Sequence, residues 1–275
     1  MQRKQSGDSD DKALRRGIYI LPNLLTSASL FSGFYAVIAA INGNYHAAAV
    51  AILIAGVLDG LDGRVARWTR TTSRFGMEYD SLSDLVAFGV APGILAFIWG
   101  LQDYGRLGWL AAFLYVATTA LRLARFNILS QSGNSSTRGY FLGLPCPSAA
   151  AVLATSVLLC QYCGIFGPVR HIAVLIMVYG LSFLMVSNVR YYNFKEVRWL
   201  QQHPFSGMVL LILAIMVLAV EPRVTLFFLM AAYVISGPVL MSFKALRPKL
   251  VRSGAVHRSD KKGVSFGKDS RTQKK

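Results

Sequence analysis

The stretch LDGLDGRVARWTRTTSRFGMEYDSLSD, residues 58–84, places four aspartates between two apolar segments. Asp59 and Asp62 are three residues apart and Asp80 and Asp84 four apart, so on helices each pair projects from one face. The apolar segments on either side, residues 45–58 and 85–101, are shorter than the about 20 residues that a bilayer crossing needs. The aspartates are therefore expected inside the two helices, at the edge of a membrane.

These four carboxylates together predict a divalent metal site. A carboxylate at the centre of a membrane-spanning helix costs about 3 kcal/mol, and less near the helix ends, so a group of four needs compensating charge. Clustered carboxylate oxygens are the ligands that Mg²⁺ or Mn²⁺ prefers when the ion also holds phosphate. We expect the two helices to run in opposite directions, which brings Asp59, Asp62, Asp80 and Asp84 to the same depth.

The composition is that of a polytopic membrane protein. Of 275 residues, 54% are hydrophobic and only 15% charged, and the mean hydropathy is +0.45, which excludes an ordinary soluble domain. The sequence predicts an all-α membrane bundle of about eight transmembrane helices, near residues 21–41, 46–68, 82–101, 107–127, 146–164, 170–187, 206–220 and 223–243.

The formal charge of +16 is explained by membrane topology and not by nucleic-acid binding. With both termini on one side, 26 of the 29 Lys and Arg residues fall on that side. Only Arg106, Arg170 and Arg223 remain for the opposite face. By the positive-inside rule both termini and the aspartates face the cytoplasm.

Four regions follow from this organisation. Residues 1–17 form a polar cytoplasmic N-terminal segment, expected to be disordered or interfacial, and 18–190 form the membrane core that carries the aspartates. Residues 191–245 hold a cytoplasmic segment and two C-terminal spans, and 246–275 form a basic disordered cytoplasmic tail. Residues 69–79 are expected to be a cytoplasmic loop, and the aromatic residues of 187–199 an interfacial belt.

Taken alone, the residue spacing predicts metal-dependent transfer on a lipid diphosphate. Two ions about 4 Å apart clamp a diphosphate, and a carboxylate free of metal takes a proton from an attacking hydroxyl group. Asn23 and Thr26, three residues apart near the start of the first span, either hydrogen-bond a phosphate or sugar or form an ordinary polar helix start. Four arginines flank the acidic stretch and suit a phosphate head group: Arg64, Arg67, Arg70 and Arg74.

The motif Asp59-x-x-Asp62-Gly63-x-x-Ala66-Arg67, eight residues, Gly76-x-x-x-Asp80-x-x-x-Asp84 resembles the full signature of the CDP-alcohol phosphatidyltransferases. The resemblance implies that Asp59, Asp62 and Asp80 bind Mg²⁺ or Mn²⁺, as two ions, with Asp84 in the same cluster as the base that activates the acceptor. It also implies a homodimer and a CDP pocket shaped by Gly63, Ala66, Arg67 and Gly76. A glycine and an alanine leave room for a nucleotide against a helix, which agrees with this role.

Further segments resemble the bacterial membrane phosphatidylserine synthase branch of that family: PNLLT at 22–26, RLARFN at 122–127 and GLPCP at 143–147. The implied reaction, at the cytoplasmic face of the inner membrane, is attack of L-serine on CDP-diacylglycerol, which releases CMP. We hypothesise that Arg122 or Arg125, with Asn127, meets the serine carboxylate. Arg138 completes a basic cluster that would also suit an acceptor carrying phosphate.

Three alternatives stay open from the residues. The same family includes enzymes that use glycerol 3-phosphate or inositol phosphate as acceptor. Intramembrane prenyltransferases also place aspartates on helices against Mg²⁺ and diphosphate, although the Gly63 and Gly76 pattern disfavours them. A divalent-cation transporter would use intramembrane acids, but such sites usually lie near the bilayer midplane.

Overall fold

The computed structural model describes residues 6–69, 73–131, 140–165, 168, 172–192 and 221–246, with isolated helical residues between 208 and 220. Residues up to Pro238 form one compact unit, which contains every contact described below. The predicted basic tail, Arg138 and most of the predicted span at 206–220 lie outside the described residues.

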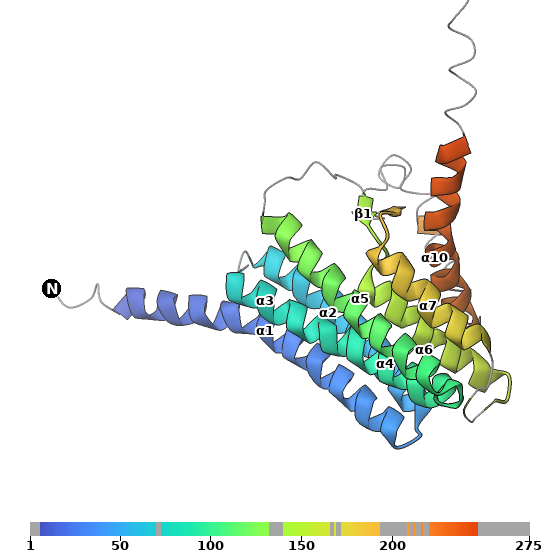
Figure 1. Cartoon of the computed structure of the whole chain (residues 1–275). Coiled ribbons are helices and arrows are strands. Elements are labelled where there is room, and N and C mark those ends of the chain that lie inside the picture. The colour runs from blue at the N-terminus through green and yellow to red at the C-terminus, as the bar shows by residue number, and fades with distance from the viewer. Residues whose placement is uncertain are drawn as a thin grey trace, which may run out of the picture. The chain divides into compact units, whose positions relative to one another are not determined.

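The described chain is helical apart from one short β ladder (Figure 1). Its first part comprises α1 (Ser6–Ile41), α2 (Tyr45–Trp68) and α3 (Arg74–Asp84). The helix of α3 continues directly through a π-helical segment η1 (Leu85–Val90), α4 (Ala91–Ala96), a second π-helical segment η2 (Phe97–Leu101) and a 3₁₀ turn η3 (Gln102–Tyr104). The later helices are α5 (Arg106–Gln131), α6 (Cys146–Tyr162), α7 (Ile172–Val186) and α10 (Pro222–Leu246).

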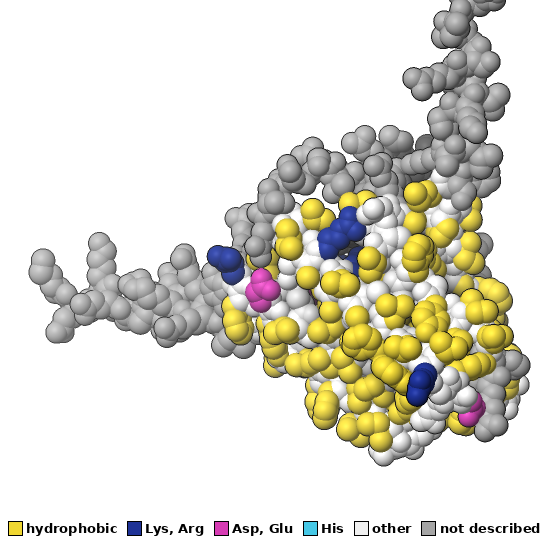
Figure 2. All heavy atoms as spheres, viewed as in Figure 1, with side chains coloured by type: hydrophobic (Ala, Val, Ile, Leu, Met, Phe, Trp, Pro, Cys, Tyr) yellow, Lys and Arg dark blue, Asp and Glu magenta, His cyan; other side chains and the backbone are white. Residues whose placement is uncertain are grey.

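Four of the described helices are long and apolar enough to cross a membrane: Leu21–Ile41, Arg74–Tyr104, Arg106–Leu129 and Pro222–Met241. The helices α6 and α7 are shorter and apolar, and α2 has 24 residues but carries charge at its end. Seven of the predicted spans therefore coincide with helices, while the total of eight and the side of the termini stay predictions. Figure 2 shows a face whose described side chains are mainly hydrophobic, as expected for contact with lipid.

Small residues bring the first three helices into close contact. Figure 1 shows α1, α2 and α3 side by side. The hydroxyl groups of Ser29 and Ser32 on α1 donate to the backbone oxygens of Ala55 (3.1 Å) and Ala51 (2.7 Å) on α2. A Cβ atom at Gly33 would lie 2.7 Å from the Cα of Ala87 in η1, so α1 packs directly against that backbone.

Two local expectations change. Helix α1 begins at Ser6, so the N-terminal segment is helical where the structure describes it. The helix contradicts the disordered alternative for residues 6–17, while the interfacial alternative stays a prediction. Helix α3 begins at Arg74 because Ser73 caps it, its Oγ accepting the backbone N–H of Gly76 at 3.0 Å. The connection between α2 and α3 is therefore shorter than the predicted loop at 69–79.

The expectation of an interfacial aromatic belt is wrong for Tyr191. Strands β1 (Tyr140–Leu142) and β2 (Arg190–Tyr192) pair antiparallel, with Phe141 opposite Tyr191. The Tyr191 side chain is fully buried, and its hydroxyl group donates to the backbone oxygen of Val234 on α10 at 3.1 Å. Burial raises the pKa of Tyr191 to about 12, so it stays protonated as a donor. The sequence indicates an aromatic residue near an interface. It does not predict the pairing of β2 with β1, which buries the Tyr191 side chain.

Candidate active site

The C-terminal half of α2 and the helix α3 bring the predicted carboxylates together. Asp59 and Asp62 lie on α2 and Asp80 on α3. One carboxylate oxygen from each lies within 4.8 Å of the other two. Asp62 is only 4% exposed, while Asp59 and Asp80 are half-buried. Three ionised carboxylates so close in a partly buried site repel one another, and a cation between them would relieve that repulsion.

Asp84 lies one helical turn beyond Asp80 and joins the same cluster. It interacts electrostatically with Asp59, Asp80 and Asp62, and its carboxyl group is in hydrogen-bond contact with that of Asp59. Its oxygens are not among the three that converge within 4.8 Å. The structure therefore gathers all four predicted aspartates, with three in a tight set and Asp84 beside them.

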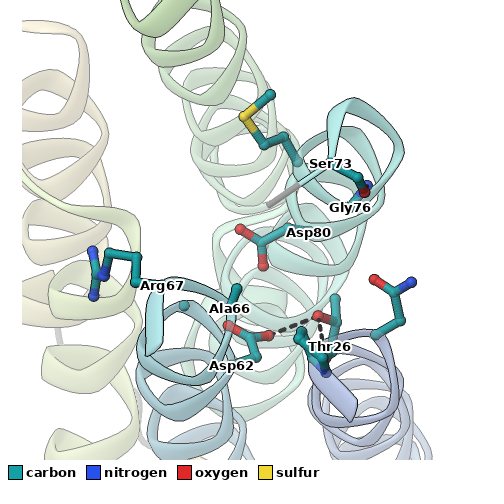
Figure 3. Close-up of a pocket in the computed structure, with 11 residues that line it drawn as sticks. Thr26, Asp62, Ala66, Arg67, Ser73, Gly76 and Asp80 are labelled. Carbon is teal, nitrogen blue, oxygen red and sulfur yellow. Dashed lines mark hydrogen bonds between the residues drawn. The ribbon is translucent and has the colours of Figure 1, made fainter. Parts of the chain in front are cut away.

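The donor set fits a hard divalent cation. All the groups are carboxylate oxygens from two rigid helices, which is the chemistry that suits Mg²⁺ or Mn²⁺ in the presence of phosphate. Asp62 and Asp80 face each other across the space between α2 and α3 in Figure 3, and the Arg67 guanidinium extends away from them. Arg67 therefore leaves the space between the two carboxylates open to an ion.

Thr26 holds the most buried of the carboxylates. Its hydroxyl group donates to Asp62 Oδ2 at 2.8 Å and lies 3.1 Å from the backbone oxygen of Pro22. The backbone oxygen of Thr26 in turn accepts from the hydroxyl group of Ser83 on α3 at 3.1 Å. Thr26 thus links α1 to both acidic helices, and its hydroxyl group orients Asp62 (Figure 3). This contact was not part of the sequence expectation for Thr26.

A cavity of about 360 Å³ opens beside the carboxylates between α1, α2 and α3. Every residue expected at the nucleotide lines it. Gly63 has open space where a side chain would be, whereas a Cβ atom at Gly76 would lie 3.1 Å from Ser73 Oγ and 3.5 Å from Asn23 Oδ1. The lining residues are Pro22, Asn23, Thr26, Asp62, Gly63, Ala66, Arg67, Ser73, Gly76, Met77 and Asp80.

The expected acceptor residues separate into different environments. Arg125 Nη2 donates to Asn188 Oδ1 at 2.9 Å, and Asn127 Nδ2 donates to Ser81 Oγ at 2.9 Å. Arg122 instead turns inward: Nη1 lies 3.5 Å from Cys146 Sγ, and Nε is buried with no hydrogen-bond partner among the described residues. Of the described candidates, Arg122 is therefore the one with a buried donor available for a ligand.

Two buried residues near the site were missed from the sequence. Ser83 contacts α1 through Thr26. Tyr115 on α5 is fully buried, and its hydroxyl group has no hydrogen-bond partner among the residues that the structure describes. The only signal for Tyr115 was its position seven residues before Arg122, on the same face of a helix. A tyrosine in an apolar helix is too common for that spacing to identify a site.

Residues 19–186 match the family model of the CDP-alcohol phosphatidyltransferases. The chain is 39% identical over 227 residues to a CDP-diacylglycerol–serine O-phosphatidyltransferase of Helicobacter pylori, covering 82% of this chain and 92% of the relative. It is 34% identical over 176 residues to the enzyme of that name from Bacillus subtilis, covering 64% and 92%. An archaetidylserine synthase of Methanothermobacter thermautotrophicus is 35% identical over 173 residues, covering 62% and 69%.

Proposed function

Because the chain belongs to the CDP-alcohol phosphatidyltransferase family, we propose that it transfers the phosphatidyl group of CDP-diacylglycerol to the hydroxyl group of L-serine. The products are phosphatidylserine and CMP. The observation that carries the chemistry is the convergence of three carboxylates beside the cavity. The choice of serine is supported by the relatives, whose names specify serine transfer or an archaetidylserine product.

The three converging aspartates, Asp59, Asp62 and Asp80, would hold the divalent metal, as two ions of Mg²⁺ or Mn²⁺. When bound, the metal neutralises charge on the diphosphate and stabilises the departing CMP phosphate. Thr26 keeps the Asp62 carboxylate in place for this role through its 2.8 Å hydrogen bond.

The cavity would bind the CDP portion of the lipid. Ala66 and the open space at Gly63 leave room for the nucleotide against α2, and Asn23, Arg67 and Gly76 line the same cavity. Arg67, in the last turn of α2, lines the cavity and would supply a positive charge for an anionic ligand. A nucleotide bound here places its diphosphate next to the carboxylates that line the cavity, Asp62 and Asp80.

Asp84 is the residue available for proton transfer, since it lies outside the three-oxygen set and yet within the cluster. The serine hydroxyl oxygen forms a bond to the β-phosphorus of CDP-diacylglycerol, and its proton passes to an Asp84 carboxylate oxygen. The bond between that phosphorus and the oxygen bridging to the CMP phosphate breaks, and CMP leaves with the electron pair.

Arg122 is the acceptor-binding arginine that the geometry supports best. Its buried Nε–H group has no hydrogen-bond partner in the part of the chain that the structure describes, whereas Arg125 and Asn127 are engaged with Asn188 and Ser81. Replacing Arg122 by Ala is expected to raise the KM for serine far more than the KM for CDP-diacylglycerol. Arg125→Ala is the matched control, and equal effects of Arg122→Ala on both KM values would remove this role.

The protein is an integral membrane protein, and we propose the inner membrane of a bacterium with the site facing the cytoplasm. The concentration of Lys and Arg in the segments assigned to that side supports this orientation. A homodimer follows from the family resemblance alone, and cross-linking in native membranes tests it.

The deciding experiment is CMP release by purified protein in detergent. CDP-diacylglycerol is supplied with Mg²⁺ or Mn²⁺ and with serine, glycerol 3-phosphate or inositol phosphate in turn. We expect release with serine, loss on chelation of the metal, and recovery when metal is restored. If CMP is released only with a phosphate-bearing acceptor, that acceptor replaces serine in the proposed reaction. If no CMP is released with any acceptor, the transferase proposal is wrong.

A further inference from the structure

Two buried hydrogen-bond donors have no partner in the part of the chain that the structure describes: the hydroxyl group of Tyr115 and Nε of Arg122. Tyr115 is fully buried. Buried polar groups are almost always paired, and an unpaired one destabilises the folded state. Two such donors on one helix therefore indicate that something with acceptor atoms occupies the space they face.

The two donors address the same region between α5 and the start of α6. Seven residues apart on α5, Tyr115 and Arg122 lie on one helix face. Arg122 Nη1 lies 3.5 Å from Cys146 Sγ, and Cys146 is also the titratable neighbour that interacts with Tyr115. Asp84 in turn interacts with Cys146, so this region adjoins the carboxylate cluster.

Neighbouring hydroxyl groups do not satisfy Tyr115. Thr118 and Thr119 donate to the backbone oxygen of Tyr115 at 3.0 Å and 2.8 Å, not to its side chain. On the facing helix Gly93 contributes no side chain, and a Cβ atom there would lie 3.8 Å from Tyr115 Cδ1. The Tyr115 hydroxyl group is thus held deep in the protein by packing, and no described residue accepts its hydrogen bond.

We propose that Tyr115 is a further specificity-determining residue, which together with Arg122 binds the carboxylate of the amino-acid acceptor. This inference rests on the proposed function. A carboxylate has acceptor atoms and no donors. It can therefore accept a hydrogen bond from both Tyr115 and Arg122, neither of which has an acceptor among the described residues. A phosphate dianion would call for more cationic donors, and among the described arginines near this region Arg125 is already engaged with Asn188.

The test is Tyr115→Phe, which removes one hydroxyl group and keeps the ring. Because a hydrogen bond to a charged group is worth about 10–100-fold in binding, the KM for serine should rise by that factor. The KM for CDP-diacylglycerol should stay within about twofold. Tyr179→Phe is the control, since the Tyr179 hydroxyl group donates to the backbone oxygen of Leu107 at 3.2 Å, away from the carboxylates.

Substrate selectivity and thermal stability together distinguish this role from a purely structural one. Ethanolamine lacks the carboxylate, so the preference of the wild type for serine over ethanolamine should fall about 10–100-fold in Tyr115→Phe. Without serine the variant should unfold at the same or a higher temperature, because it loses an unpaired buried donor. In the wild type, L-alanine, which keeps the carboxylate but lacks the hydroxyl group, should compete with serine.

An unchanged KM for serine together with unchanged selectivity in Tyr115→Phe would overturn the inference. Failure of L-alanine to compete in the wild type would overturn it independently of any variant. Failure of the proposed function is a separate result, because the wild type would then release no CMP with serine at all.

Discussion

Replacing Thr26 by Val tests whether the buried hydrogen bond to Asp62 prepares the carboxylate cluster for a cation. Thr26 and Asp62 are each 4% exposed, and the hydroxyl group donates to Oδ2 at 2.8 Å. Valine has nearly the same shape, so the change removes the donor and little packing. A buried hydrogen bond to a charged group contributes about 1.5–3 kcal/mol, which corresponds to roughly 10–100-fold in an equilibrium constant.

Loss of a group that orients a metal ligand costs about the same factor in metal affinity, 10–100-fold. We therefore expect the Mg²⁺ or Mn²⁺ concentration for half-maximal CMP release to rise about 10–100-fold in Thr26→Val. The maximal rate should return largely to that of the wild type at saturating metal. The assay is CMP release at saturating CDP-diacylglycerol and serine across a metal titration.

Two variants control for other effects of the substitution. Thr26→Ser keeps the hydroxyl group and should keep the metal dependence of the wild type. Thr155→Val removes a buried threonine hydroxyl group that lies 2.7 Å and 3.2 Å from backbone oxygens of its own helix, α6. The reasoning is refuted if Thr26→Val titrates like the wild type, or if its loss of activity is the same at every metal concentration.

The remaining predictions concern the cavity, the base and the packing of α10. Gly63→Leu should raise the KM for CDP-diacylglycerol at least about tenfold by filling the open space, while Gly60→Leu, outside the cavity lining, should not. Asp84→Asn should lower kcat about 10²–10⁴-fold, and an unchanged kcat would exclude it as the base. Gly237→Ala should lower the thermal unfolding midpoint, since a Cβ atom there would clash with the Tyr191 ring; an unchanged midpoint would contradict that packing.

The sequence was sufficient for seven of the predicted helices and for the grouping of the carboxylates, because both depend on local spacing. Apolar runs of membrane length predict helices, and spacings of three and four residues place Asp59 with Asp62 and Asp80 with Asp84 on single faces. Because two consecutive helices run in opposite directions, the end of the first lies beside the start of the second. The two pairs of aspartates therefore meet at the same end of the helix pair. The observed set of three oxygens within 4.8 Å follows from those rules.

The contacts that the sequence did not predict join residues far apart in the chain. The hydrogen bond from Thr26 to Asp62 spans 36 residues and that from Ser83 to Thr26 spans 57. A threonine three residues after Asn23 is equally compatible with a ligand contact, so periodicity does not distinguish the two. Tyr191 was misassigned for the same reason, because only the pairing of β2 with β1 carries it inward.

The placement of the carboxylates depends on apolar packing below them as much as on the acidic residues themselves. Gly33 lets α1 lie against the η1 backbone just after Asp84, and Ser29 ties α1 to α2 at Ala55, one turn before Asp59. Neither contact involves a charged group. Both fix how far α2 and α3 stand apart, and repulsion between the carboxylates acts to widen that separation. Because densely packed helices resist this separation, the carboxylates stay close together before any ion binds. A bound divalent cation would relieve their repulsion without first having to assemble the site.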